Sequence, residues 1–127
     1  MELRGLWIAS VDNMDWPSSA SVSPSDQQQE LLRYLDLMEE MKMNCVFFQV
    51  RPVGDAFYVS EIEPWSVYLT GSQGEAPDPL WDPLAFMVEQ AHSRNIQVHA
   101  WINPYRAKVG EQCYFFEVLT YFKFSFI

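Results

Sequence analysis

Apolar residues recur along the chain at two different spacings, which predict strands and helices in turn. Residues 3–10, LRGLWIAS, are a short apolar and aromatic run with a polar loop after it, which is typical of a strand. Residues 45–50, CVFFQV, are almost continuously apolar, as in a parallel strand that is covered on both faces. Residues 96–102 alternate, with Ile96, Val98, Ala100 and Ile102 predicted on one face and Gln97, His99 and Trp101 on the other.

Two segments with helical spacing lie between these strands. The first is predicted to begin with Ser23 as its N-cap, because Pro24 and Asp26 follow at positions that favour a first turn. It should end near residues 43–44, and its apolar stripe consists of Leu31, Tyr34, Leu35, Met38 and Met41. Asp82 and Pro83 predict the second helix start by the same reasoning, and Asn95 is the expected stop. The buried stripe of this second helix is Leu84, Met87, Val88 and Ala91.

The order strand, helix, strand, helix, strand predicts an α/β fold with a parallel sheet and right-handed crossovers. We expect the strands to pair in the order in which they occur in the chain, with both helices on one face, as in a (β/α) barrel. Helices on opposite faces would indicate a doubly wound sheet instead. A long loop, at about residues 53–81, separates the second strand from the second helix, and loops of that length are usually functional.

Charge and composition narrow the range of ligands. The chain has 127 residues and a formal net charge of -9, so it lacks the basic surface that nucleic-acid binding needs. Its two cysteines, Cys45 and Cys113, make neither a disulfide framework nor a metal-binding spacing, and no metal or cofactor is predicted. There is no secretion signal and no apolar stretch of about 18 residues, so no membrane span is predicted. A neutral or polar substrate fits this composition better.

Polar and aromatic side chains gather where each predicted strand ends, which is where α/β folds bind ligands. After the first strand come Ser10, Asp12, Asn13, Asp15 and Trp16. The second strand gives Gln49, Arg51, Asp55 and Tyr58, and the third gives His99, Trp101, Asn103, Tyr105 and Arg106. Aromatic faces that stack on sugar rings, beside groups that hydrogen-bond to hydroxyls, favour a carbohydrate ligand.

Each of these residues also has a structural interpretation. Asp12, Asn13 and Asp15 could simply form a turn, and His99 could be a satisfied core histidine. A buried Gln49 must be hydrogen-bonded, so it is either a linker inside the sheet or a ligand contact. Arg51 needs an anionic partner, and the predicted one is Asp55, whose pKa such a cation would lower. Trp65 and Trp81 could close a lid over the site or pack beneath it.

Long segments of the chain resemble one bacterial family. The segments RGLWIAS with NMDWP, VFFQVRPVGDAFY with EPWSVYLTG, and DPLAFMVEQAHSRNIQVHAWINPYR are similar to the glycosyl hydrolase-like 10 domain family, in order, over about residues 3–108. The resemblance implies the first two to three βα units of a (β/α)₈ TIM barrel, a location in the bacterial envelope or outside the cell, and glycan substrates such as peptidoglycan strands. It also implies a sugar cleft lined by Gln49, Arg51, Asp55, His99, Trp101, Asn103, Tyr105 and Arg106.

The sequence departs from the family after about Lys108. Family members continue to a paired-acid segment, Asp-Asp-Tyr, which has no match here, and an aromatic tail follows instead. We therefore expect residues 1–110 to be the N-terminal part of the barrel and residues 111–127 to be foreign to it. The predicted function is that of a glycoside hydrolase-like protein in the form of an inactive fragment. The alternative is a non-catalytic carbohydrate-binding remnant, and the sequence predicts no oligomeric state.

Overall fold

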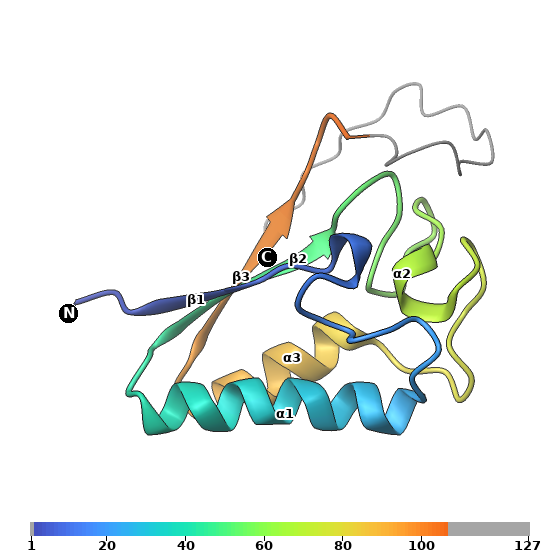
Figure 1. Cartoon of the computed structure of the whole chain (residues 1–127). Coiled ribbons are helices and arrows are strands. Elements are labelled where there is room, and N and C mark those ends of the chain that lie inside the picture. Colours follow the sequence, from blue (N-terminus) through green and yellow to red (C-terminus); the bar gives the residue numbers. More distant parts are fainter. Residues whose placement is uncertain (1, 107–127) are drawn as a thin grey trace.

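The computed structural model describes residues 2–106, and the predicted tail at 111–127 lies outside the described residues. The described chain forms three strands, three α-helices and one 3₁₀ turn (Figure 1). In chain order these are β1 (Gly5–Ile8), η1 (Val11–Asn13), α1 (Pro24–Glu40), β2 (Cys45–Arg51), α2 (Val67–Thr70), α3 (Pro83–His92) and β3 (Gln97–Ile102).

The strands form one parallel sheet in the order β1-β2-β3, as predicted. Gly5 is in register with Cys45, and Cys45 is in register with Gln97. The first strand is shorter than the predicted 3–10, because the backbone of Ala9 turns away from the sheet. Its carbonyl accepts hydrogen bonds from the N–H groups of Asp15 and Trp16, and its own N–H binds the Asp15 carboxylate.

Both long helices begin where their capping residues predict. The Ser23 hydroxyl accepts the N–H of Asp26, and Asp82 Oδ1 accepts the N–H of Ala85 at 2.8 Å. Both end earlier than predicted. Helix α1 stops at Glu40, two residues before Lys42 takes a left-handed conformation with φ 54°, and α3 stops at His92, before Asn95 with φ 57°. Met41, predicted in the apolar stripe of α1, therefore lies beyond the helix and is 56% exposed.

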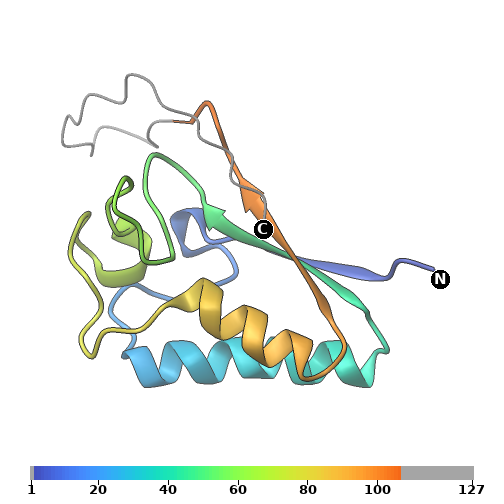
Figure 2. The same cartoon turned by 180° about the vertical axis from the view of Figure 1, so that it is seen from behind.

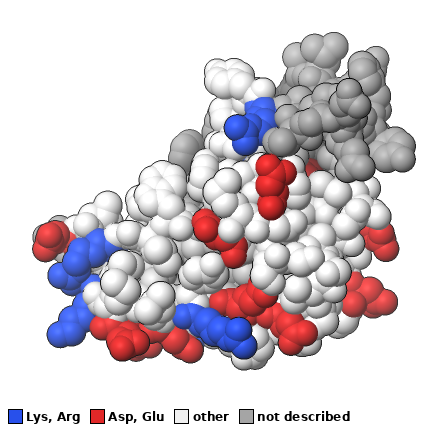
Figure 3. All heavy atoms as spheres, viewed as in Figure 1, with Lys and Arg blue, Asp and Glu red and all other residues white. Residues whose placement is uncertain are grey.

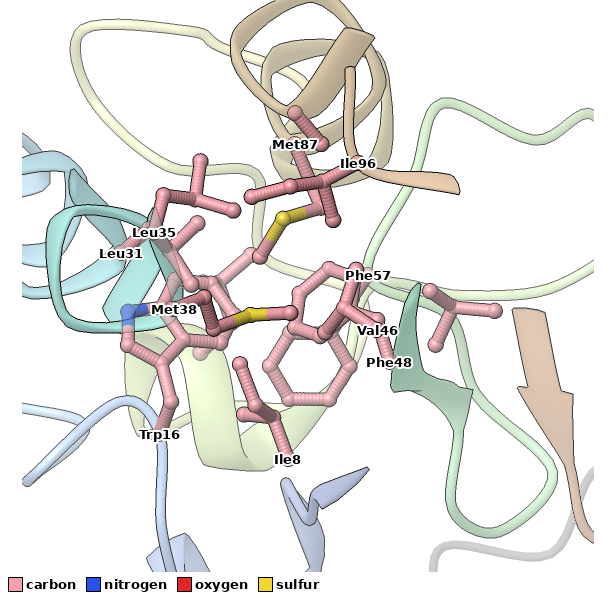
Figure 4. Packing of buried hydrophobic residues seen from close by; sticks show 13 residues of the cluster. Ile8, Trp16, Leu31, Leu35, Met38, Val46, Phe48, Phe57, Met87 and Ile96 are labelled. Atoms are coloured by element: carbon pink, nitrogen blue, oxygen red, sulfur yellow. The ribbon is translucent and has the colours of Figure 1, made fainter. Parts of the chain in front are cut away.

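Helices α1 and α3 lie side by side on one face of the sheet, which confirms the predicted arrangement (Figures 1 and 2). The core fills the space between them and the sheet (Figure 4). The sheet contributes Ile8, Val46 and Phe48, the helices contribute Leu31, Leu35, Met38 and Met87, and the loops contribute Trp16, Phe57 and Ile96. This one-sided packing is compatible with part of an α/β domain, since it occurs in a (β/α) barrel and also within one half of a doubly wound sheet.

The opposite face of the sheet carries an aromatic cluster, consisting of Trp7, Phe47, His99 and Trp101. Trp7 stacks on Phe47 with ring centroids 4.3 Å apart, and Trp101 meets Trp7 edge-on at 5.2 Å. His99 lies 5.1 Å from Phe47. The Phe47 ring also packs closely on Gly5, because a Cβ added at Gly5 would come within 2.9 Å of it. The Trp7 side chain remains 59% exposed. This cluster is therefore a large aromatic surface that the described helices leave uncovered.

We expect the purified chain to bind a hydrophobic dye and to associate as its concentration rises, because contiguous exposed apolar surface drives both. Substitution of Trp7 by Ser should reduce both effects, since it removes a large exposed ring of the cluster. Leu80→Ser is a matched control, because Leu80 is also exposed, at 67%, but lies outside the sheet. Dye fluorescence and sedimentation velocity measure the outcome. A chain that stays monomeric and binds no dye would contradict the expectation.

The long loop between β2 and α3 contains a short helix, α2, that the sequence pattern did not predict. Ser66 caps it by accepting the N–H of Tyr68, and Gly71 ends it with φ 89°, a conformation that glycine adopts without strain. A single turn is too short to show an apolar period. This turn brings Tyr68 toward the carboxyl end of the sheet, where the Nδ2 of Asn13 donates to the Tyr68 carbonyl at 2.7 Å.

Candidate functional site

Gln49 joins the carboxyl ends of β1 and β2. The side chain is fully buried, and its Oε1 accepts the backbone N–H groups of Ser10 at 2.8 Å and Val11 at 3.0 Å. The Ser10 hydroxyl donates in return to the Gln49 carbonyl at 2.8 Å. The Oε1 atom of Gln49 is therefore a linker inside the sheet, which was one of the two predicted alternatives for this side chain. The amide nitrogen of Gln49 has no hydrogen-bond partner among residues 2–106.

Arg51 pairs with Glu63, so the predicted ion pair with Asp55 is wrong. The guanidinium Nη2 lies 2.6 Å from a carboxylate oxygen of Glu63, and both side chains are largely buried. The path of the loop explains the choice of partner. The Phe57 N–H binds the Val50 carbonyl, and Ala56 bridges to Trp65, so the chain doubles back and carries residue 63 beside the end of β2.

Asp55 is a buried carboxyl, and the prediction that the Arg51 cation lowers its pKa is also wrong. It has no exposed surface, and burial raises the pKa of Asp55 to about 6. The Ser66 hydroxyl and two backbone N–H groups lower that pKa in part, but neither carboxylate oxygen has a well-aligned hydrogen bond within residues 2–106. The nearby Glu63 carboxylate raises it slightly. A buried acid that titrates near neutral pH is more common at functional sites than elsewhere.

The end of β3 is tied to the end of β2 through Asn103. Its N–H donates to the Arg51 carbonyl at 2.9 Å, and its Nδ2 donates to the Pro52 carbonyl at 3.0 Å. Its Oδ1 accepts the indole N–H of Trp101 at 3.0 Å. Trp101 is in register with Gln49. Gln49, Arg51, Trp101 and Asn103 therefore lie together at the carboxyl end of the sheet.

The other predicted residues lie around this group. His99 is in register with Phe47, one layer further from the carboxyl end than Trp101. Tyr105 is 95% exposed, and Arg106 is also exposed. Arg106 nevertheless lies close enough to Tyr68 to lower the pKa of that phenol. The structure thus brings the stretch after β3 near to α2.

Hydrogen bonding is least complete at the end of β2. Six buried side-chain atoms of residues 2–106 have no partner, and four of them belong to Gln49, Arg51 and Asp55. Buried polar atoms are normally satisfied by protein groups, ordered water or ligands, so the end of β2 is where such groups would complete the hydrogen bonding of residues 2–106. The sequence analysis missed two residues here, Glu63 and Tyr68. Both lie in the long loop, within the segment EPWSVYLTG that carries part of the family resemblance, but no periodicity singles out either residue.

Other surface features of the described residues are less specific. A hollow of about 290 Å³ lies against α1, and Asp15 is the one residue of the predicted strand ends that lines it. Its lining is Asp15, Ser18, Glu30, Arg33, Tyr34 and Leu37. No three potential metal-binding side chains come together within residues 2–106, and none of the helices there is long and apolar enough to cross a membrane. The face in Figure 3 carries scattered acidic side chains and no continuous basic patch on its described part.

Comparison with known proteins gives consistent similarities. Residues 2–113 match the family described as glycosyl hydrolase-like 10. The chain is 55% identical over 105 residues to a protein of Bacillus subtilis (strain 168) named glycosyl hydrolase YngK. The matched segment covers 83% of this chain and 20% of YngK. It is 46% identical over 115 residues to glycosyl hydrolase DigH of Escherichia coli (strain K12), covering 85% of this chain and 26% of that protein. The chain therefore spans about a fifth to a quarter of the length of these relatives.

Proposed function

Because this chain belongs to the glycosyl hydrolase-like 10 family, we propose that it binds glycan strands at the carboxyl end of its sheet. The proposed glycan is the sugar backbone of peptidoglycan, and the proposed location is the bacterial envelope. We also propose that residues 2–106 are the first βα units of a (β/α)₈ barrel. The parallel order β1-β2-β3 and the position of both long helices on one face support this barrel.

The observation that carries the proposal is the composition of the strand ends. Trp101 offers an aromatic face beside the Asn103 amide, and Gln49 has a buried amide nitrogen that lacks a partner within residues 2–106. Arg51 has an unpartnered Nε in the same described region. Sugars present C–H faces to aromatic rings and hydroxyl groups to amides and guanidinium groups. This combination of groups supports a neutral, hydroxyl-rich ligand.

We further propose that the 127-residue chain binds glycan without hydrolysing it. Hydrolysis of a glycosidic bond normally needs two carboxyl groups that flank the bond, about 5–5.5 Å or 6.5–9.5 Å apart. Two of the carboxyl groups near the strand ends have other roles, because Asp15 accepts the Ala9 N–H and Glu63 pairs with Arg51. Asp12 is exposed and Asp55 is buried, and neither belongs to the paired-acid segment that the family resemblance calls for.

The expected result is that the purified chain releases no new reducing ends from peptide-free peptidoglycan strands or from simple β-linked oligosaccharides. A muramidase in a parallel reaction checks that the strands are cleavable. Weak binding should still appear as quenching of tryptophan fluorescence, because Trp101 lies at the proposed cleft. Hydrolysis that disappears in the Asp55→Asn variant would show instead that a catalytic carboxylate lies within this chain. Absence of binding to every glycan tested would overturn the proposed function.

A further inference from the structure

We propose that Glu63 sets the charge preference of the glycan cleft, because its pairing with Arg51 cancels the cation at the end of β2 and leaves a cleft that accepts neutral sugars and disfavours sugars with a carboxylate. This inference rests on the proposed glycan-binding function and narrows its ligand. In the sugar backbone of peptidoglycan, neutral N-acetylglucosamine alternates with N-acetylmuramic acid, whose lactyl group ends in a free carboxylate once the peptide is removed. The sugar beside Arg51 is then N-acetylglucosamine.

The ion pair between Arg51 and Glu63 is short and shielded from water. Nη2 of Arg51 lies 2.6 Å from Oε1 of Glu63, and the two side chains are only 12% and 18% exposed. In every other ion pair of residues 2–106, the carboxylate is more than half exposed. A pair that is largely buried is screened little by solvent and salt, so the charge of Glu63 offsets that of Arg51 where a ligand would meet it.

Backbone hydrogen bonds fix the part of the loop that carries Glu63. The Ser60 hydroxyl accepts the Glu63 N–H at 2.9 Å. The Ala56 N–H donates to the Pro64 carbonyl at 2.8 Å, and the Ala56 carbonyl accepts the Ser66 N–H at 2.9 Å. The chain is therefore held on both sides of residue 63, and its carboxylate is in place at the end of β2 before any ligand binds.

Stability alone does not account for this pair. Taking two charges out of water is costly, and an apolar pair of similar size is often as stabilising or more so. The position of Arg51 ties it instead to the proposed cleft. Its carbonyl accepts the Asn103 N–H at 2.9 Å, and Asn103 Oδ1 accepts the Trp101 indole N–H. The guanidinium also keeps a buried Nε that has no partner within residues 2–106.

The end of β2 holds more acid than base. Asp55 is buried next to Ala56, whose N–H bonds to Pro64, so the chain segments that carry Asp55 and Glu63 run side by side. Burial raises the pKa of Asp55 only to about 6, so this carboxyl is mostly ionised at about pH 7.5. The carboxylate of an incoming sugar therefore meets net negative charge here, and the formal net charge of -9 on the whole chain acts in the same direction.

The test uses two oligosaccharides that differ in charge. One is a chitin tetrasaccharide, which is neutral. The other is a peptide-free peptidoglycan tetrasaccharide, which has the same linkage and N-acetyl groups but carries lactyl carboxylates. Amide shifts in NMR spectra give the dissociation constant of each probe at about pH 7.5, below the unfolding transition. The ratio of the two constants is compared among variants, because a variant that only loosens the fold weakens the binding of both probes.

The unchanged chain should bind the neutral probe at least as tightly as the charged one, and the variants should move the ratio in opposite directions. Glu63→Gln frees Arg51 for a charge-assisted hydrogen bond, so it should favour the charged probe by roughly tenfold relative to the unchanged chain. Arg51→Gln leaves the Glu63 carboxylate unpaired and should favour the neutral probe. The double variant removes both charges and should restore the ratio of the unchanged chain.

Glu61→Gln is the matched control, because it removes the same charge from an exposed residue of the same loop and should leave the ratio as it is. Each single variant at the pair also leaves one largely buried charge without its partner, so both should be less stable than the unchanged chain. The two single variants predict opposite shifts, so either one tests the inference if the other fails to fold.

The outcomes separate the two proposals. If the unchanged chain binds sugar but the variants at the pair leave the ratio unchanged, Glu63 has only a structural role and this inference is overturned alone. Tighter binding of the charged probe by the unchanged chain would also overturn it. If neither tetrasaccharide binds to the unchanged chain, the proposed function fails and this inference fails with it.

Discussion

Asp55→Asn should stabilise the protein at neutral pH. The pKa of Asp55 is raised from 3.8 to about 6 by burial, so the folded state binds this proton more tightly than the unfolded state does. A difference of that size corresponds to roughly 3 kcal/mol of folding free energy that is lost once the carboxyl ionises. The amide carries no charge to bury. It must still find an acceptor for its N–H₂ group, so we expect a rise in Tm of roughly 5–15 °C at about pH 7.5.

The pH dependence distinguishes this explanation from a simple packing gain. A carboxyl with a raised folded-state pKa contributes stability below its unfolded pKa and loses that contribution as the pH rises through its folded pKa. The unchanged protein should therefore lose stability between about pH 4 and pH 6.5, and Asp55→Asn should lack this loss. Thermal melts across that range measure it, with exposed Glu61→Gln as the matched control. A variant that is less stable than the parent at neutral pH would refute the argument.

The elements of this fold were predictable because their signals are local. Ser23 and Asp82 begin their helices through side-chain caps that occur within three residues, and residues 45–50 form a strand whose apolar run is continuous. The residues at which the helices and β1 end were less predictable. Helix α1 stops near a left-handed Lys42, a residue with no intrinsic preference for that conformation. The end of β1 depends on Asp15, whose carboxylate turns the chain from six residues away.

The candidate site was predictable in its position but not in its pairings. Parallel strands bring their carboxyl ends to one edge, so Gln49, Trp101 and Asn103 could be grouped from the sequence alone. The partner of Arg51 could not be found in this way. Asp55 is the nearer acid in sequence, whereas Glu63 is the nearer in space because the loop doubles back. That path depends on backbone hydrogen bonds that leave no pattern in the side chains.

The sequence also could not assign different roles to the three polar residues that follow β1. Asp12, Asn13 and Asp15 are all common in turns, and the same composition serves a turn or a binding site. Their hydrogen bonds divide them, since Asp15 and Asn13 bind backbone groups while the Asp12 side chain is exposed. The bond from Asn13 to the Tyr68 carbonyl depends on α2, a single turn of helix that no periodicity indicates.

Gln49→Leu should destabilise the protein more than any exposed polar substitution on the sheet. Leucine is close in size to glutamine but cannot accept the N–H groups of Ser10 and Val11, which would remain buried without partners. Each such loss costs about 1–3 kcal/mol, so we expect roughly 2–6 kcal/mol in total, measured by urea unfolding. Ser10→Ala, which removes the hydroxyl bond to the Gln49 carbonyl and a longer one, at 3.5 Å, to Gln49 Oε1, should cost about 1 kcal/mol.

The matched control for this series is Gln97→Leu, because Gln97 is an exposed glutamine on β3 and should change stability by less than about 0.5 kcal/mol. The order of losses is therefore Gln49→Leu, then Ser10→Ala, then Gln97→Leu. Since Gln49 is part of the proposed cleft, the Gln49→Leu variant should also disturb the end of β1 beside that cleft. Its glycan affinity, measured below the unfolding transition, should fall. A Gln49→Leu protein as stable as the parent would mean that water or another group satisfies both N–H donors, and that Gln49 does not hold the two strand ends together.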